Sequence, residues 1–208
     1  MENTLGIHIN LPSQLVLSIK KAKDRVGLEY WGNYNFDPHI TLYLSRFSRK
    51  NFSKLVSGLT NLSVRPFKLR ISSVMFAQEE GGVFCYLSVA RSVNLLKLHK
   101  LVVNSANGLR ENLLRQKDVF KIKKGYYNAT QEGYIKKYGY LRVLKFFNPH
   151  VTLGQVANNE FDKKKFRDLF IIFRNRIIEV NSLTVGLYSY DNKKGIYRKE
   201  ILSRSISL

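Results

Sequence analysis

Residues 37–42 read DPHITL and residues 148–153 read NPHVTL, so one motif of proline, histidine, hydroxyl and leucine occurs twice in the chain. Successive side chains of a strand point to opposite faces. In each motif the aliphatic residues therefore share one face, and the opposite face carries an imidazole and a hydroxyl: His39 with Thr41, and His150 with Thr152. A duplicated strand would need to repeat only its buried residues. Because the polar face is repeated as faithfully as the apolar one, the pattern favours a shared functional site.

The segments around the two motifs follow a similar order of elements. Alternating apolar residues predict a strand over 5–11, followed by a helix over 13–26 and then by the first motif strand. A helix, a hairpin turning near 79–82 and a long helix come next. After the second motif, a helix over 161–175 and a closing hairpin over 177–208 complete the chain. We therefore expect an α+β fold of two pseudo-symmetric lobes with the motif strands side by side.

Residues 116–147 differ in composition from the rest of the chain. They are rich in lysine and tyrosine, contain scattered glycines and show weak periodicity. Within a single two-lobed domain over residues 1–208, this segment is interpreted as a basic insert. Its composition suits a lid or side wall that grips phosphates and stacks bases. The alternative is a solvated loop.

The chain is strongly basic, with 35 Lys and Arg against 15 Asp and Glu and a net charge of +20. Such a surface favours polyanionic partners, namely RNA, DNA, nucleotides or an acidic membrane, and basicity that serves solubility alone is the alternative. The N-terminal MENTLGIHINLPSQ lacks the pattern of a signal peptide, and no apolar run approaches the roughly 20 residues of a membrane helix. The only cysteine, Cys85, can form no internal disulfide. We expect a soluble, cytoplasmic protein without membrane association or an obligate protein partner.

The two histidines suit acid–base catalysis at a phosphate. Imidazole titrates near neutrality, so one histidine can act as general base and the other as general acid. Threonine hydroxyls can hold phosphate oxygens. This chemistry requires no metal and no cofactor, and the sequence contains neither an HExxH motif nor a CxxC pair. The sequence leaves open which histidine is the base.

Several further residues are candidates for substrate binding. By strict alternation, Tyr43 shares the face of His39 and Thr41, and His8 and Asn10 take the polar face of the first strand. Aromatic residues ahead of the first motif offer surfaces on which bases can stack: Trp31, Tyr34 and Phe36. For these aromatic residues the alternative is packing onto the core. For His8 and Asn10 it is an ordinary exposed position.

HIT at 39–41 and HVT at 150–152 resemble the paired H-x-T/S signatures of the two-histidine (2H) phosphoesterase superfamily. This superfamily includes 2'-5' RNA ligase-like cyclic phosphodiesterases, 2'-5' oligoadenylate phosphodiesterases and enzymes that degrade cyclic nucleotide signals. LGIHINLP resembles its first strand and LYSYDNKKGIYRKEI its closing hairpin. The resemblance implies antiparallel sheets flanking a central cleft, the four motif residues as catalytic groups, and Tyr197 at the border of the pocket. The histidines are farther apart than the family leads us to expect, and the surplus falls in the basic insert.

We therefore expect a metal-independent phosphodiesterase acting on 2'-linked or 2',3'-cyclic phosphodiesters. Two substrate classes stay open. Short oligonucleotides or RNA ends fit the positive charge, and cyclic nucleotide second messengers fit the chemistry equally well, with a role in immune evasion if the source is a virus. The rival from another class is a non-catalytic RNA-binding module on the same fold. Such a module would need the cations but not both histidines and both threonines.

Overall fold

The structure, a computed structural model, describes residues 2–28, 37–79, 82–191 and 196–208. These residues form an eight-stranded sheet with the strand order β6-β3-β4-β5-β2-β1-β7-β8. The strands are β1 (Glu2–Asn10), β2 (His39–Arg46), β3 (Phe67–Glu79), β4 (Gly82–Val89), β5 (His150–Val156), β6 (Ile177–Val180), β7 (Ser182–Asp191) and β8 (Ile196–Ser207). The α-helices are α1 (Ser13–Arg25), α2 (Phe52–Thr60), α3 (Val93–Asn107), α4 (Gln116–Lys123), α5 (Ala129–Tyr138) and α6 (Lys163–Phe170). Short 3-10 turns are η1 (Arg49–Asn51), η2 (Leu144–Phe146), η3 (Asn158–Glu160) and η4 (Ile171–Phe173).

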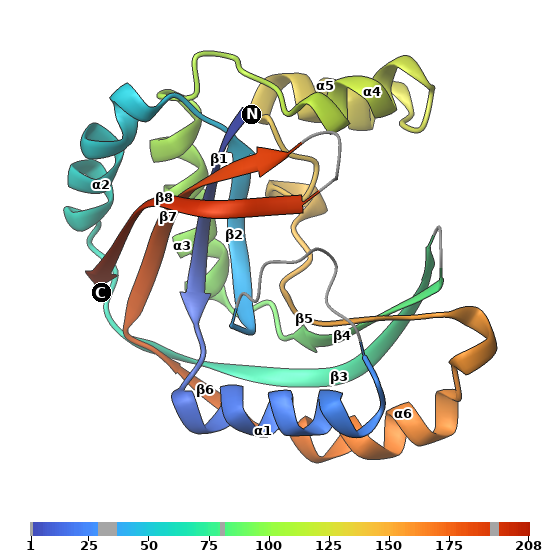
Figure 1. Ribbon diagram of the computed structural model, residues 1–208. Coiled ribbons are helices and arrows are strands. Elements are labelled where there is room, and N and C mark those ends of the chain that lie inside the picture. The colour runs from blue at the N-terminus through green and yellow to red at the C-terminus, as the bar shows by residue number, and fades with distance from the viewer. Residues whose placement is uncertain (1, 29–36, 80–81, 192–195) are drawn as a thin grey trace.

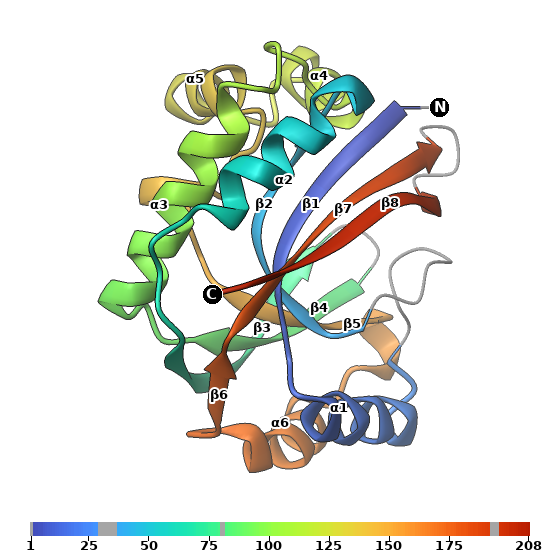
Figure 2. The same ribbon diagram turned by 90° about the vertical axis from the view of Figure 1, so that its left-hand side faces the viewer.

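The central strands β2 and β5 join two halves of the sheet. β2, β1, β7 and β8 form one half, and β5, β4, β3 and β6 form the other. The halves meet where Ile40 of β2 pairs antiparallel with Val151 of β5. In Figures 1 and 2, α2 and α3 cover the outer side of the first half, whereas α1 and α6 lie along the outer side of the second. The predicted α+β fold with adjacent motif strands and antiparallel pairing is confirmed.

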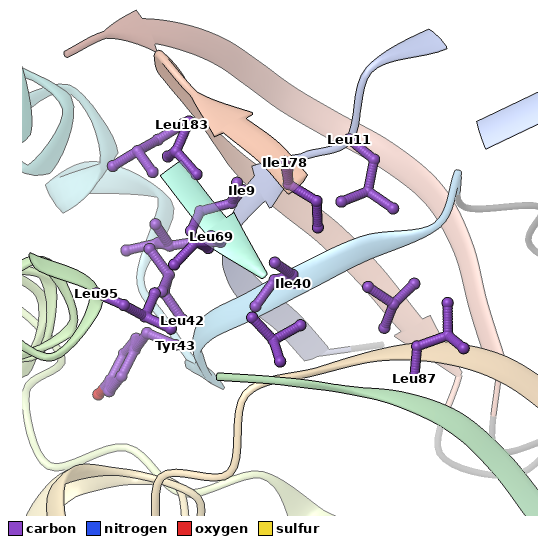
Figure 3. Close-up of a cluster of buried hydrophobic side chains, with 14 of the residues drawn as sticks. Ile9, Leu11, Ile40, Leu42, Tyr43, Leu69, Leu87, Leu95, Ile178 and Leu183 are labelled. Atoms are coloured by element: carbon purple, nitrogen blue, oxygen red, sulfur yellow. The ribbon is translucent and has the colours of Figure 1, made fainter. Parts of the chain in front are cut away.

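One buried core holds the two halves together. Figure 3 shows aliphatic side chains from the strands of both halves converging with Leu95 of α3. Ile40 and Val151 at the junction are fully buried. Burying a side chain of this size stabilises the fold by about 1.5–3 kcal/mol relative to leaving it exposed. The apolar faces of the motif strands are therefore anchored in the core, and their polar faces point away from it.

Each motif contains a β-bulge at its leucine. The pairing of β2 with β1 shifts between Tyr43 and Thr41, which leaves Leu42 as the extra residue. The pairing of β5 with β4 shifts in the same way between Gly154 and Thr152, which leaves Leu153 extra. An extra residue reverses the side-chain alternation beyond it. The repeated leucine of the motifs thus marks the place where each polar face ends.

The expectation that Tyr43 shares the face of His39 and Thr41 is wrong. The Tyr43 side chain is fully buried, and its hydroxyl donates to the carbonyl oxygen of Tyr138 at 2.6 Å. The bulge at Leu42 turns Tyr43 into the core, where burial raises the pKa of its hydroxyl to about 12. Tyr43 therefore connects β2 to the end of α5 and does not face the motif residues.

Two further segments differ from the sequence-based expectation. In its described residues, the region predicted as a closing hairpin contains three strands, because β6 pairs with β3 whereas β7 pairs with β1 and β8. The chain changes partner at Asn181, between β6 and β7. The insert over 116–147, in which weak periodicity was the main feature, contains α4 and α5. These helices lie together at one end of the molecule (Figure 1).

A buried arginine ties the insert to the core. Arg110 is fully buried, and its guanidinium donates to the carbonyl oxygens of Leu113, Lys136 and Lys137 at 2.5, 3.1 and 3.0 Å. The last two carbonyls belong to the final turn of α5, where helix carbonyls lack intrahelical partners. A cation is favourable at this end of a helix. Arg110 therefore ties the end of α5 to the segment that follows α3, beside Tyr43 of β2.

We expect alanine at Gly139 to destabilise the protein. Gly139 ends α5 with a φ of 71°, and a Cβ there would collide with Ser45 Oγ and lie 2.6 Å from Arg110 Cδ. Gly139→Ala should lower the free energy of unfolding by more than about 1 kcal/mol, because a positive φ and a steric contact both oppose the side chain. The control is Gly58→Ala in α2, where a Cβ has open space, and it should raise stability by about 0.4–1 kcal/mol. Urea denaturation measures both, and effects of the same sign would contradict the expectation.

In the part of the chain that the structure describes, no helix combines the length and the apolar character required to cross a bilayer.

Candidate active site

The two motifs bring their histidines and threonines together across the central strand pair. Because β2 and β5 run antiparallel through the pair Ile40–Val151, the residues before and after it face each other. His39 therefore lies opposite Thr152, and Thr41 lies opposite His150. All four side chains are half-buried, whereas Ile40 and Val151 are fully buried. Two imidazoles and two hydroxyls thus share one face at the junction of the halves.

The backbone selects the same tautomer for both histidines. His39 Nδ1 lies 2.8 Å from the carbonyl oxygen of Asp37, and His150 Nδ1 lies 2.7 Å from that of Asn148. A carbonyl oxygen can only accept, so each Nδ1 carries the proton and donates. Nε2 is then the nitrogen that gains or loses a proton at the site. The proline between each carbonyl and its histidine is part of this repeated turn.

Burial lowers the pKa of both motif histidines. For His39 the hydrogen bond to Asp37 and the charge of the Asp37 carboxylate offset part of this effect. The pKa of His150 falls to about 4 because of burial, opposed by the Asn148 hydrogen bond and supported by the charges of Arg142 and His39. Both imidazoles are therefore mainly neutral at pH 7 in the free protein.

A third imidazole lies beside this pair. The ring of His8 on β1 lies 4.5 Å from the ring of His39, centroid to centroid, at an interplanar angle of 39°. The pKa of His8 is well below its ordinary value, because of burial and then the charge of His39. Neutral His8 can therefore pack against His39 without charge repulsion.

A cavity of about 560 Å³ opens beside His39. His8 and Asn10 line it, as predicted from the polar face of the first strand. Asn10 Nδ2 donates to Thr184 Oγ1 at 2.7 Å. Among the other residues that line the cavity, Thr184, Tyr188 and Glu200 were not predicted as site residues from the sequence. Thr184 and Tyr188 could have been grouped from the sequence, because positions 184 and 188 share one face of β7 by alternation.

Two aromatic side chains of β4, Phe84 and Tyr86, lie on the His150 side of the junction and form what we call the aromatic wall. The rings of Tyr86 and Phe84 on β4 lie 5.3 and 6.3 Å from the ring of His150, both edge-on. They alternate with buried Cys85, so they share the face of the strand that is directed at His150. The alternation of FCY at 84–86 could have indicated this from the sequence, whereas the residues predicted to stack on bases were Trp31, Tyr34 and Phe36. Phe84 and Tyr86 therefore supply an aromatic surface at the site.

Several predicted contacts fall outside what the structure describes. Trp31, Tyr34 and Phe36 belong to residues 29–36, which are not described. Tyr197 lies in β8 opposite Tyr190, and its side chain is not among those described. These four residues stay predictions.

An arginine of the insert was missed altogether by sequence reasoning. Arg142 Nη1 lies 3.1 Å from His150 Nε2. Nothing in the local sequence around Arg142 distinguishes it from the other cations of the insert. The contact arises only because the chain leaving α5 passes the start of β5.

Possible metal ligands are not clustered in the described ranges. Across residues 2–28, 37–79, 82–191 and 196–208, no group of three or more His, Cys, Asp or Glu is arranged to hold a metal ion. Asp37, the carboxylate next to the first motif, forms an ion pair with Lys20. The donors at the junction are therefore imidazoles, hydroxyls and a guanidinium, a set suited to proton transfer and anion binding.

The fold and the paired motifs of this chain also occur in other proteins. A sequence model of the 2'-5' RNA ligase superfamily matches residues 11–170, which is more than half of the chain. The chain belongs to this superfamily, within the two-histidine phosphoesterases, as the motifs predicted.

Solved structures share the fold over nearly the whole chain. LigT of E. coli complexed with 3'-AMP has a TM-score of 0.53 at 14% identity, with 99% of each chain covered. LigT complexed with NADP+ has a TM-score of 0.56 at 12% identity, again with 99% of each chain covered. The protein TT0787 of Thermus thermophilus has a TM-score of 0.55 at 13% identity, covering 98% of this chain and 97% of that chain. At these identities the likeness establishes the fold alone. No curated protein sequence matches the chain.

Proposed function

We propose that the protein is a metal-independent phosphodiesterase that hydrolyses 2'-linked or 2',3'-cyclic phosphodiesters. Its substrates would be short oligonucleotides, RNA ends or cyclic nucleotide messengers, encountered in the cytoplasm. The observation that carries the proposal is the antiparallel pairing of the two motifs, which sets each histidine opposite the threonine of the other. His39 and His150 would exchange protons with the substrate through Nε2, and Thr41 and Thr152 would hold non-bridging phosphate oxygens.

For a 2',3'-cyclic phosphate the proposed step is hydrolysis in one displacement. One imidazole takes a proton from water as the water oxygen bonds to phosphorus. The bond between phosphorus and one ribose oxygen breaks, and the second imidazole gives its proton to that oxygen. The products are a phosphomonoester and a ribose hydroxyl, and proton exchange with solvent restores the pair. No metal ion takes part in this sequence of proton transfers.

Charge and shape support a nucleotide substrate. The chain carries a net charge of +20, which attracts phosphodiesters from solution. LigT, which has the same fold, has been crystallised with 3'-AMP and with NADP+. The cavity beside His39 offers space for a nucleoside, and Phe84 and Tyr86 present an aromatic surface beside His150. Bases could stack on Phe84 or Tyr86.

The test is a turnover panel in excess EDTA. It would contain 2'-5' oligoadenylate, 2',3'-cGAMP, a 3'-5' cyclic dinucleotide and RNA ending in a 2',3'-cyclic phosphate. Cleavage of at least one 2'-linked or 2',3'-cyclic member, with EDTA present, is the expected result and identifies the linkage. If no member is cleaved while RNA still binds tightly, the protein is a binding module and the proposal fails.

We expect kcat/KM to be highest at acidic pH. The reaction needs one protonated and one neutral imidazole, and the pKa values of His39 and His150 are both lowered from the ordinary 6.5. Above pH 6.5 both imidazoles of the free protein are mainly neutral, and toward pH 4 His150 becomes protonated. The profile should therefore be a bell with its maximum below pH 6.5. A pH series at constant ionic strength measures it, and a rate that climbs steadily into the alkaline range would contradict the two-histidine pair.

A further inference from the structure

The insert reaches the candidate active site through Arg142. This residue lies between α5 and η2, and its side chain is half-buried. Its Nη1 donates to His150 Nε2 at 3.1 Å, since His150 Nδ1 carries the proton that is donated to Asn148. The guanidinium therefore occupies the nitrogen through which His150 would exchange a proton. In this arrangement His150 can neither accept a proton from a substrate nor donate one to it.

A substrate phosphate provides an alternative partner for the guanidinium. Arginine binds phosphate oxygens through two parallel N–H groups, and such charge-assisted bonds are roughly twice as strong as neutral ones. A neutral imidazole nitrogen offers a single weaker acceptor. A phosphodiester held between Thr41 and Thr152 would lie next to His150 across the strand pair. Transfer of Arg142 from the imidazole to the phosphate would then release Nε2 and place a positive charge on the reacting group.

We propose that Arg142 is a phosphate-binding residue of the active site, contributed by the insert, that leaves His150 Nε2 when the substrate phosphate enters. This inference rests on the proposed function of the two-histidine site and adds a residue that neither motif contains. The positive charge would stabilise the negative charge that builds on the phosphate oxygens during displacement.

The chain on the C-terminal side of Arg142 is held in place, so only the side chain needs to move. Val143 is fully buried. The backbone N–H of Leu144 donates to His99 Nε2 at 2.8 Å, and the ring of His99 stacks on Phe147 at a centroid distance of 3.7 Å. His99 Nδ1 in turn lies 3.0 Å from the carbonyl oxygen of Leu42, at the bulge of the first motif. The first motif strand therefore positions the segment that carries Arg142.

The movement of the Arg142 guanidinium from His150 to a phosphate can be followed through the pKa of His150. Arg142 and His39 lower its pKa by their charges, and the phenol of Tyr86 packs edge-on against its ring. Removing the guanidinium, by substitution or by transfer to a phosphate, takes away one of these effects. The pKa of His150 should therefore rise in either case.

The experiment compares Arg142→Gln and Arg142→Lys with Arg65→Gln. Arg65 is exposed in the loop between α2 and β3, so Arg65→Gln makes the same chemical change away from the site. The probe is adenosine 3'-monophosphate, with affinity measured by calorimetry and the His150 imidazole followed by NMR titration. We expect Arg142→Gln to weaken binding by about 10- to 100-fold and to raise the pKa of His150. Arg142→Lys should fall between it and the wild type, and Arg65→Gln should match the wild type.

The outcomes separate this inference from the proposed function. If Arg142→Gln raises the pKa of His150 but binds the nucleotide as tightly as the wild type does, Arg142 only supports the histidine and the inference is wrong. If nucleotide binding depends on Arg142 but no member of the turnover panel is cleaved, the inference holds and the proposed function fails. If the wild type does not bind the nucleotide, the inference is wrong, and the turnover panel alone decides the proposed function.

Discussion

Replacing His39 or His150 by alanine should reduce turnover by about 10²- to 10⁴-fold while leaving nucleotide affinity within a few-fold of the wild type. The reason is that each imidazole exchanges a proton with the substrate, whereas the threonines and cations that would hold the phosphate stay in place. Single-turnover rates for each variant, on whichever panel member the wild type cleaves, measure the effect. Thermal melts of the same samples show whether the fold is retained.

A variant that lacks both histidines tests whether the two imidazoles act together. Groups that act as one unit lose most of their effect when either is removed, so His39→Ala combined with His150→Ala should be little slower than the worse single variant. Multiplicative losses would indicate two independent contributions and would argue against a shared proton-transfer pair. Retention of turnover within a few-fold in either single variant would remove that histidine from the mechanism.

Arg110→Met should lower the free energy of unfolding by about 1–3 kcal/mol for each carbonyl oxygen that loses its donor. Arg110 is fully buried and donates hydrogen bonds to the carbonyl oxygens of Leu113, Lys136 and Lys137. Methionine fills much of the same volume but leaves those part-buried carbonyl oxygens without their donor, and unsatisfied groups of this kind are costly. Urea denaturation measures the loss.

The matched control for Arg110 is Arg65→Met, which makes the same change at an exposed position. It should shift stability by no more than about 0.5 kcal/mol. If Arg110→Met were equally mild, the insert would not depend on this arginine for its attachment. Because Arg110 holds the end of α5, a partly unfolded insert should also expose α4 and α5 to proteolysis before the rest of the chain.

The part of the site that could be predicted from sequence is the part set by local alternation. His39, Thr41, His150 and Thr152 each stand one residue from a buried aliphatic side chain, and the structure places them on one face. The same rule placed His8 and Asn10 correctly at the cavity. It failed at Tyr43, because the bulge at Leu42 interrupts the alternation.

Long-range packing decided the remaining features. The region predicted as one closing hairpin is divided because its first strand, β6, pairs with β3, whereas β7 pairs with β1. These pairings depend on strands that are distant in the sequence. The helices of the insert are held by Arg110 and a capping box at Asn128, although their periodicity is weak. The approach of Arg142 to His150 depends on the path of the chain between α5 and β5.

The sequence by itself determined the two strands, their polar faces and the chemistry of an imidazole beside a hydroxyl, because a strand repeats every two residues whatever lies around it. Only the tertiary structure decided that the strands meet antiparallel at Ile40 and Val151, that both bulge at the motif leucine, and that a guanidinium from the insert covers one histidine. These features require contacts between residues distant in sequence. Such contacts are selected by the packing of the whole core and leave no local pattern.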